Sequence, residues 1–479
     1  MTSARRYLLL VLAACLALAL PSGTLASTNL PLTTSNGSSF ADVLVKFQPE
    51  TLSNGHLSAN DSDILVSSGA VDSVQSLGDT GAYRVAVRSG YTAAGVAAQL
   101  ALQPEVVYAE ADQPVTLDDS LASWQSTTDP GNQNWDLDAI DAQQAWTLGT
   151  GHGVVVAVLD TGVSVTHPAF AGRVLPGWNV IDNSGDTADD SGHGTFVAGL
   201  IAGAQTTNGF AGVAPGVTIL PVKVLDSTET GSTASFVAGI NYAVQAGAKI
   251  INLSASGATD SPALEDALAN AEAHNVLVVT AAGNEANEVP TYPAAASTVL
   301  AVSATDQTNA LASFSSYGPY IDIAAPGVDV TSSWWSASGG DGYTTASGSS
   351  ASAPLVAGAA AIVAGLRPDL SAAQLREILT ESAKDVESPG IDAQTGHGLL
   401  DVYAAARIAR EPAAPRTATL STVDASDGWH LRLTADGFTP NEPLIVWTDS
   451  AAGYRVVRNL SADDTGSLST DLGPEWTVP

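Results

Sequence analysis

The stretch VVVAVLDTG, Val154–Gly162, sets six consecutive apolar residues directly before an aspartate. A strand without polar alternation is buried on both faces, which is typical of a parallel sheet covered by helices. Further largely apolar runs follow, separated by alanine-rich stretches with helical spacing, at 217–225, 249–254, 276–282, 298–304 and 321–327. The pattern predicts a doubly wound α/β domain with a mostly parallel sheet, which we assign to residues 119–410.

Polar residues follow these apolar runs, at the end of the strands where α/β folds place their sites. Asp160 ends the first run, and its carboxylate is suited to orient an imidazole, although many such aspartates only form turns. His193 stands between two glycines before a stretch of small residues, although a single histidine in a loop often has no functional role. Asn284 follows the run 276–282 and is either a turn former or an amide donor to an oxyanion.

The segment GSSASAPLVAG, Gly348–Gly358, places serines in front of a smooth apolar helix. We expect Ser350 at the start of this helix, where a backbone N–H has no partner within the helix and can bind an anion. We expect Pro354 in the first turn, where the missing N–H of proline matters least. The alternative is that these serines are only helix N-caps, which suits the neighbours of Ser350 better than Ser350 itself.

Together these segments resemble the subtilisin-like serine protease family, the subtilases, in which the order along the chain is Asp, His, Ser. The likeness covers roughly residues 135–410 and includes DTGVSVTHP, GHGTFVAG, TAAGNE, GSSASAPLVAGAA and GHGLLDV, with a spacing nearest to the thermitase-like branch. The resemblance implies that Asp160 orients the general base His193. It also implies that Ser350 is the nucleophile and Asn284 the oxyanion donor of a serine endopeptidase that works through an acyl-enzyme.

The same resemblance implies a substrate-binding wall. Its residues are Ser254, Ala255, Ser256 and Gly257, with Ala282 and Gly283 beside them. Ser256 stands where the family has a glycine, so its CH2OH group narrows or polarises the pocket, and Glu285 at the rim favours basic residues. Such differences change discrimination between substrates by about 10- to 200-fold. We expect protein and peptide substrates, with the preference next to the scissile bond left open.

Calcium is the one cofactor that the resemblance brings in, and no organic cofactor is expected. Ala169 replaces an aspartate of the family's tightest calcium site, which predicts that this site is weakened or lost, although Asp129 matches its N-terminal ligand. The loop NVIDNSGDTADDSGHG resembles the second calcium loop of thermitase-like enzymes. Its four carboxylates lie at a density that suits Ca²⁺, and they are Asp182, Asp186, Asp189 and Asp190. The alternative is an acidic loop that is only solvated.

Residues 27–118 are predicted to be a polar lead followed by a small α+β unit. ADVLVKF and YRVAVRS alternate like strands, while YTAAGVAAQLAL has helical spacing. The unit ends in VVYAEAD and resembles the inhibitory propeptide of the same family. That resemblance makes the chain its own intramolecular inhibitor, removed by a cut between about Leu117 and Asp129.

Residues 1–26 are predicted to be a signal peptide, because Arg5 and Arg6 precede an apolar stretch that ends near the small-residue site Thr24–Ala26. The apolar stretch is shorter than the roughly 20 residues that span a bilayer, so we expect a secreted protein without a membrane anchor. Cys15 lies within this stretch, and a lipoprotein cysteine would normally end it. Cys15 is also the one cysteine of the 479 residues, so a disulfide framework is excluded.

The net charge of −32 disfavours binding to nucleic acid and to anionic membranes.

After a linker around Pro412–Pro415, residues 416–479 show alternating strands and turn signals, which predict a small all-β module. A monomer is the default for this architecture.

Two other functions compete with that of an endopeptidase. A catalytically silent subtilisin-like module for binding or inhibition is compatible with the altered residues near Ser350 and at Ser256. An esterase of the α/β-hydrolase type is disfavoured, because Gly348–Ala351 lacks the closing glycine of the Gly-x-Ser-x-Gly elbow.

Overall fold

The computed structural model describes residues 42–49, 52, 57, 69–117, 134–170, 172–205, 210–410, 417–425, 428–436, 443–449, 455–461 and 467–471. The predicted signal peptide, the polar lead to Phe40 and residues 118–129 of the expected processing window lie outside these ranges. The chain forms two compact units, which divide between Arg407 and Ile408. This division lies before the predicted start of the β module at 416.

The N-terminal part of the first unit is an antiparallel sheet covered by one helix. Its strands have the order β2 (Val71–Ser76), β3 (Ala82–Val87), β1 (Val43–Phe47) and β4 (Val106–Ala111). Helix α3 (Ala93–Leu100) begins after Thr92, whose hydroxyl accepts a hydrogen bond from the Gly95 N–H. Successive residues of β1 point to opposite faces, so Val43 and Val45 join the core under α3 while Leu44 packs into the core of the larger domain. These elements fit the expected α+β unit.

The rest of the first unit is built on a seven-stranded sheet in which every neighbouring pair is parallel. The order is β13 (Ile323–Pro326), β12 (Leu300–Thr305), β11 (Leu277–Ala281), β10 (Ile250–Leu253), β6 (Val155–Asp160), β8 (Thr218–Lys223) and β7 (Trp178–Asn179). The predicted parallel sheet is confirmed. Its central strands are buried along nearly their whole length, as their unbroken apolar runs require.

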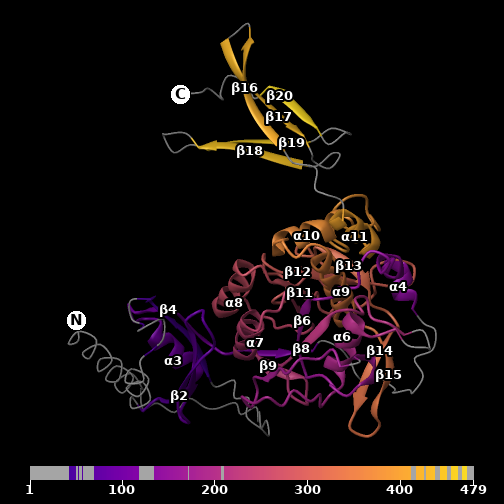
Figure 1. The fold of residues 1–479 in the computed structure, drawn as a ribbon. Helices are drawn as coiled ribbons and strands as arrows, with labels where there is room; N and C mark the ends of the chain where they lie inside the picture. Colours follow the sequence, from indigo (N-terminus) through magenta and orange to yellow (C-terminus); the bar gives the residue numbers. More distant parts are fainter. Residues whose placement is uncertain are drawn as a thin grey trace. The chain divides into compact units, whose positions relative to one another are not determined.

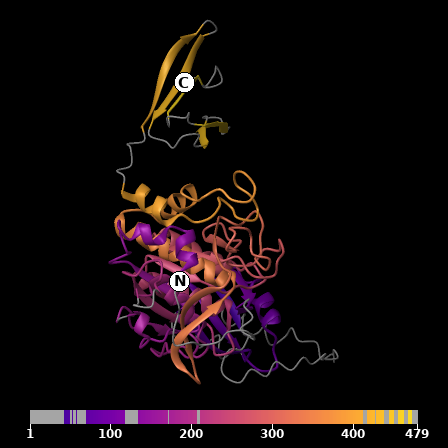
Figure 2. The ribbon, with the colours of Figure 1, turned by 90° about the vertical axis from the view of Figure 1, so that its right-hand side faces the viewer.

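Helices cover both faces of this sheet (Figure 1, Figure 2). Helices α7 (Thr233–Gln245) and α8 (Pro262–Ala273) share one core with alternate residues of β6, β8, β10 and β11. Helices α6 (His193–Ala202) and α9 (Ser349–Leu366) pack against each other and the opposite face. By length and composition α9 could cross a membrane, but most of it is buried inside the molecule, so it is a core helix.

The strand order places the end of β6 at the point where the chain changes direction across the sheet. From β6 the chain continues to β7 and β8 on one side, and then returns to β10 on the other side of β6. Such a switch point opens a crevice at the carboxyl ends of the strands, which is where open α/β sheets bind ligands. Asp160 is the last residue of β6 and therefore lies at this crevice.

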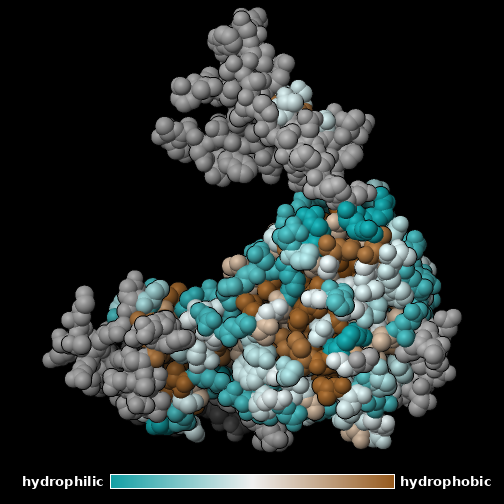
Figure 3. All heavy atoms as spheres, viewed as in Figure 1, coloured by the Kyte–Doolittle hydropathy of each residue, from teal (hydrophilic) through white to brown (hydrophobic). Residues whose placement is uncertain are grey.

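Smaller elements complete the first unit. They are α4 (Trp135–Ala139), α5 (Ala142–Ala145), the 3₁₀ turn η3 (Pro168–Phe170), the hairpin β14 (Val330–Ser336) with β15 (Gly340–Ala346), α10 (Ala372–Glu381) and α11 (Val402–Arg410). Hydrophilic residues cover much of the surface around α10 and α11 in the view of Figure 3, in keeping with the acidic composition.

The second unit is described by its strands. β16 (Thr417–Ala425), β17 (Gly428–Asp436) and β20 (Leu468–Asp471) form one antiparallel sheet, and β18 (Pro443–Asp449) pairs with β19 (Arg455–Ser461). These pairings fit the expected small β module.

Candidate active site

A buried carboxylate–imidazole pair occupies the crevice. The Nδ1 atom of His193 lies 2.8 and 2.9 Å from the two carboxylate oxygens of Asp160, and both residues are fully buried. Asp160 also accepts a hydrogen bond from the Thr161 N–H at 2.7 Å. In this arrangement the carboxylate holds the Nδ1 proton, so that Nε2 is the nitrogen available for proton transfer. The structure thus brings together two of the residues that the sequence singled out.

The two glycines beside His193 let backbone segments approach where no side chain would fit. Gly192 has φ 113°, and a Cβ on it would lie 2.3 Å from the Trp335 carbonyl oxygen. A Cβ on Gly194 would lie 2.0 Å from the Gly162 carbonyl oxygen. Gly194 therefore allows the start of α6 to sit directly against the loop after Asp160, and Gly192 allows it to sit against the strand β14.

Ser350 is the second residue of α9 and is 4% exposed. The expectation for Pro354 was wrong, because α9 begins at Ser349 and Pro354 is therefore its sixth residue. A proline there cannot donate the helical hydrogen bond to the carbonyl of Ser350, four residues earlier. The Ser254 hydroxyl instead donates to that carbonyl at 3.3 Å. The proline thus leaves the Ser350 carbonyl free of its helical partner and open to the Ser254 hydroxyl.

Asn284 lies against the first turn of α9. Its Oδ1 accepts a hydrogen bond from the Ser349 N–H at 2.8 Å. The preceding residue, Gly283, exchanges hydrogen bonds with the Ser349 hydroxyl at 3.1 and 3.2 Å. The carboxamide oxygen is fixed by these contacts one residue from Ser350, and the amide NH2 is the donor group of that side chain.

The predicted substrate wall contacts Ser350 through Ser254 and the N-terminal part of the chain through Ser256. Thr116 and Ser256 exchange two backbone hydrogen bonds, at 3.0 and 3.1 Å. On its other side the segment β5 (Pro114–Thr116) pairs antiparallel with β9 (Thr230–Ser232), and the Leu117 N–H reaches the Glu229 carbonyl at 3.3 Å. An extended segment held between two strands is the binding mode expected of a peptide in a groove.

Of the other predicted wall residues, Ala255 is buried, Gly257 is bonded to the Tyr292 backbone, and Ala282 supports the neighbouring loop. Ala282 is fully buried, and its N–H donates to the Val302 carbonyl at 2.9 Å. Its own carbonyl accepts from the Thr291 hydroxyl at 3.1 Å. Ala282 therefore supports the loop that carries Gly283 and Asn284.

The four carboxylates proposed for calcium do not fit a metal site. In the described ranges no group of three or more His, Cys, Asp or Glu side chains is placed to hold an ion. Asp189 is buried and accepts hydrogen bonds from Thr161, Gly192 and Thr195, while Asp190 pairs with Lys223 at 2.7 Å. Asp186 accepts from the Ala188 N–H at 3.1 Å. Carboxylates committed in this way are not the convergent oxygen ligands that Ca²⁺ requires.

Sequence reasoning missed two parts of the site. The strand β9, which forms the second side of the groove, is three residues long and carried no signal of its own. The contacts of Asp189 with Thr161 and Thr195 were also missed, because the density of acidic residues in the loop pointed to an ion.

Comparisons with known proteins agree with this geometry. A sequence profile of the subtilase family matches residues 151–398. Thermitase of Thermoactinomyces vulgaris is 40% identical over 253 residues, which are 52% of this chain and 88% of thermitase. The minor extracellular protease of Bacillus subtilis is 36% identical over 315 residues, 64% of this chain and 48% of that protein. The solved structure of a protease from Pseudoalteromonas arctica superposes with a TM-score of 0.54 and 29% identity, covering 60% of this chain and all of that one.

Proposed function

The chain belongs to the subtilase family of serine endopeptidases, and on that premise we propose that it is a secreted endopeptidase made as a self-processing zymogen. The observation that carries the proposal is the buried pair of Asp160 and His193 at the switch point of the sheet, with the nitrogen of the imidazole oriented by the carboxylate. The family resemblance expected from the sequence is confirmed by the comparisons.

In the proposed mechanism His193 Nε2 removes the proton of the Ser350 hydroxyl as Oγ attacks the carbonyl carbon of a peptide bond. The resulting oxyanion accepts hydrogen bonds from the amide of Asn284 and the backbone N–H of Ser350. His193 then donates its proton to the leaving amine, and an acyl-enzyme on Ser350 remains. Water activated by His193 hydrolyses the acyl-enzyme and restores the hydroxyl.

The electrostatics favour this sequence of proton transfers. Asp160 is fully buried and is held by the Thr161 N–H and by the imidazole, so its charge is available to stabilise the imidazolium that forms. A charge pair in a site with little water interacts more strongly than the same pair in bulk solvent.

For residues 27–118 we propose the role of an intramolecular inhibitor. Two carboxylates at the end of β4 reach helix N-termini of the larger domain. Glu110 accepts from the Ser261 hydroxyl and the Ala263 N–H at α8, at 2.7 and 3.1 Å, and Asp112 accepts from the Ala234 N–H at α7, at 3.0 Å. Negative charge at a helix N-terminus is stabilised by the unpaired N–H groups there.

The same segment continues into the groove. Val115 is buried in a core shared with α7 and α8, and the backbone of Thr116 is bonded to Ser256 as a substrate strand would be. A segment bound in this way blocks access to Ser350 until it is cut, which supports processing within residues 117–129 and a mature domain that begins near 119.

Secretion is proposed from the N-terminal segment 1–26 and from the likeness to the extracellular protease of Bacillus subtilis. The substrates proposed are proteins and peptides in an extended conformation, because the groove binds its occupant by backbone hydrogen bonds. A monomer is proposed, and residues 416–479 are proposed to be a separate β module.

The experiment that tests the function compares the wild-type chain with Ser350→Ala during expression. The active chain is expected to shed a fragment that ends near Leu117 and to degrade casein in a manner blocked by a sulfonyl fluoride. The variant is expected to keep its full length. Equal processing in both, without casein turnover, would support the silent binding module instead.

A further inference from the structure

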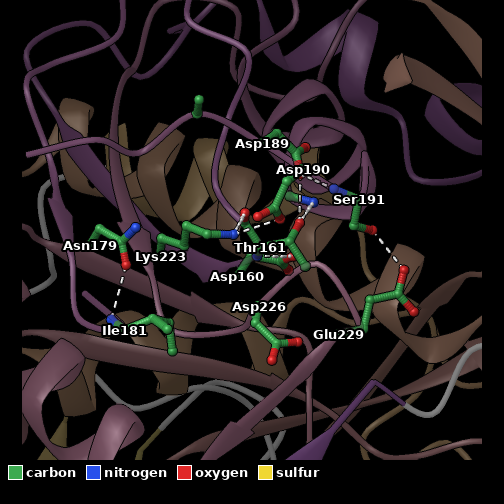
Figure 4. A network of polar contacts seen from close by, with 12 residues as sticks. Asp160, Thr161, Asn179, Ile181, Asp189, Asp190, Ser191, Lys223, Asp226 and Glu229 are labelled. Atoms are coloured by element: carbon green, nitrogen blue, oxygen red, sulfur yellow. Dashed lines mark hydrogen bonds and ion pairs between the residues drawn. The ribbon is translucent and has the colours of Figure 1, made fainter. Parts of the chain in front are cut away.

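Asp189 forms a network of hydrogen bonds with residues that flank Asp160 and His193 along the chain. Figure 4 shows Asp189 together with Asp160, Thr161 and Ser191. Its side chain is 3% exposed. It accepts hydrogen bonds from five protein groups, namely the hydroxyl of Thr161 (2.8 Å), the N–H of Ser191 (3.2 Å), the N–H of Gly192 (2.9 Å), and the N–H and hydroxyl of Thr195 (2.8 and 2.5 Å). Five donors on one carboxylate saturate it, so no lone pair is left for a metal ion.

The donors come from both sides of the catalytic pair. Thr161 directly follows Asp160 at the end of β6, and its hydroxyl also accepts the Gly194 N–H at 3.0 Å. Thr195 belongs to the first turn of α6, two residues after His193, and its hydroxyl also accepts the Ser164 N–H at 2.9 Å. One carboxylate therefore links the segment that carries the acid to the segment that carries the base.

The side chain of Asp189 is held in place by its donors. Burial raises the pKa of Asp189 above its ordinary value, and hydrogen bonds from Thr195, Gly192 and Thr161 oppose that shift. Three of its five donors are backbone N–H groups before or within the first turn of α6, where a negative charge is favoured. If one donor is lost, the rest of the network has to rearrange, because a buried carboxylate without partners is costly.

We propose that Asp189 is a positioning residue that fixes the separation of Asp160 and His193. This inference rests on the proposed function of that pair. It replaces the expectation that Asp189 binds calcium. The donors to Asp189 belong to Thr161, Ser191, Gly192 and Thr195 and not to Asp160, His193 or Ser350, so we place its effect in the geometry of the pair and not in the chemistry.

Two kinds of variant test the inference. Asp189→Asn keeps the shape but puts an NH2 group where donors of Thr195 or Thr161 now point, while Thr161→Val removes one donor and keeps the carboxylate. Thr161→Ser restores the hydroxyl. Asp186→Asn is the matched control, since it makes the same chemical change in the same loop at an exposed carboxylate.

The prediction is a loss in kcat with KM retained. A displacement near 1 Å between catalytic groups costs about 100-fold, so we expect kcat to fall about 10- to 100-fold in Asp189→Asn and Thr161→Val. KM should stay within about twofold, and Thr161→Ser should return kcat to within about threefold of wild type. The far-downfield proton resonance of the His193 Nδ1–H hydrogen bond should shift or broaden in the two impaired variants and stay in place in Asp186→Asn.

Each variant is expressed as the full-length chain and is allowed to process itself before the kinetics are measured. Where a variant processes slowly, added wild-type enzyme completes the processing. Wild-type activity blocked by a sulfonyl fluoride establishes the proposed function independently of Asp189. If that holds and Asp189→Asn or Thr161→Val keeps wild-type kcat, the positioning role is wrong. It is equally wrong if Asp186→Asn is impaired to the same degree and added Ca²⁺ restores both aspartate variants. Should Asp189→Asn not fold, Thr161→Val is compared with Thr195→Val, because each removes one hydroxyl donor to Asp189 from a different element. Both variants must then lower kcat, and a wild-type kcat in either one refutes the positioning role.

Discussion

Gly194→Ala should inactivate the enzyme while leaving its fold intact. By helix propensity alone this change in α6 would stabilise the chain by about 1 kcal/mol, since alanine is the better helix former. The structure predicts that the same change lowers the catalytic activity, because the new methyl group has no room. The new Cβ would lie 2.0 Å from the Gly162 carbonyl oxygen and 3.2 Å from the Cβ of Asp160.

The expected size of the effect follows from the clash. Real Cβ atoms essentially never come closer than 3.0 Å to such neighbours, so the start of α6 and the loop after Asp160 must separate by about 1 Å. Both contacts are backbone or first side-chain atoms, which cannot rotate away. A separation of that size in a catalytic pair lowers kcat/KM by about 100-fold, or about 2.7 kcal/mol in transition-state stabilisation.

The assay is kcat/KM on a chromogenic peptide, with melting temperature measured in parallel. Gly185→Ala is the control, because it lies in the loop before His193 and a Cβ there meets nothing within 4 Å. We expect Gly185→Ala to stay within about twofold of wild type. A folded Gly194→Ala enzyme with activity within threefold of wild type would refute the reasoning about the close approach.

Three further predictions concern the oxyanion donor, pH and processing. Asn284→Ala should lower kcat about 100- to 1000-fold with little change in KM, a range that comes from subtilisin itself; an unchanged kcat would remove Asn284 from the mechanism. Burial raises the pKa of Asp136 to about 7, so its contribution to stability is present below its unfolded pKa near 4 and is lost as pH rises through 7. Asp136→Asn should therefore gain stability relative to wild type as the pH rises from about 4 to about 7, by up to about 1.4 kcal/mol per pH unit. A difference in melting temperature that does not change over this range would contradict this. Intact-mass analysis of the processed chain should give an N-terminus within residues 118–130; a terminus before Thr116 would be incompatible with the strand seated in the groove.

The fold and the pair at its centre follow from simple patterns in the sequence. The apolar run ending at Asp160 required a strand buried on both faces, and the end of such a strand is where a site forms. The glycines on either side of His193 are visible in the sequence, and the structure shows that both allow a close backbone approach. These features depend on residue type and local spacing, so they can be read along the chain.

Other features depend on contacts that spacing does not specify. The start of α9 is set by a hydrogen bond from the Gly348 N–H to the Gly327 carbonyl, at 2.8 Å, from a loop some twenty residues earlier. Because this contact comes from a distant part of the chain, the sequence alone did not show that Pro354 lies in the second turn of α9 and not in the first. The role of Asp189 was hidden in the same way, since its partners Thr161 and Thr195 come from two different elements.

The most direct test of the whole account is covalent labelling with a sulfonyl fluoride, followed by intact mass and peptide mapping. The mechanism requires a single adduct per chain, located on Ser350, that forms readily in the wild type and is lost when His193 is replaced by alanine. An adduct on another serine, or labelling of Ser350 at the same rate without the imidazole, would show that these side chains do not work together.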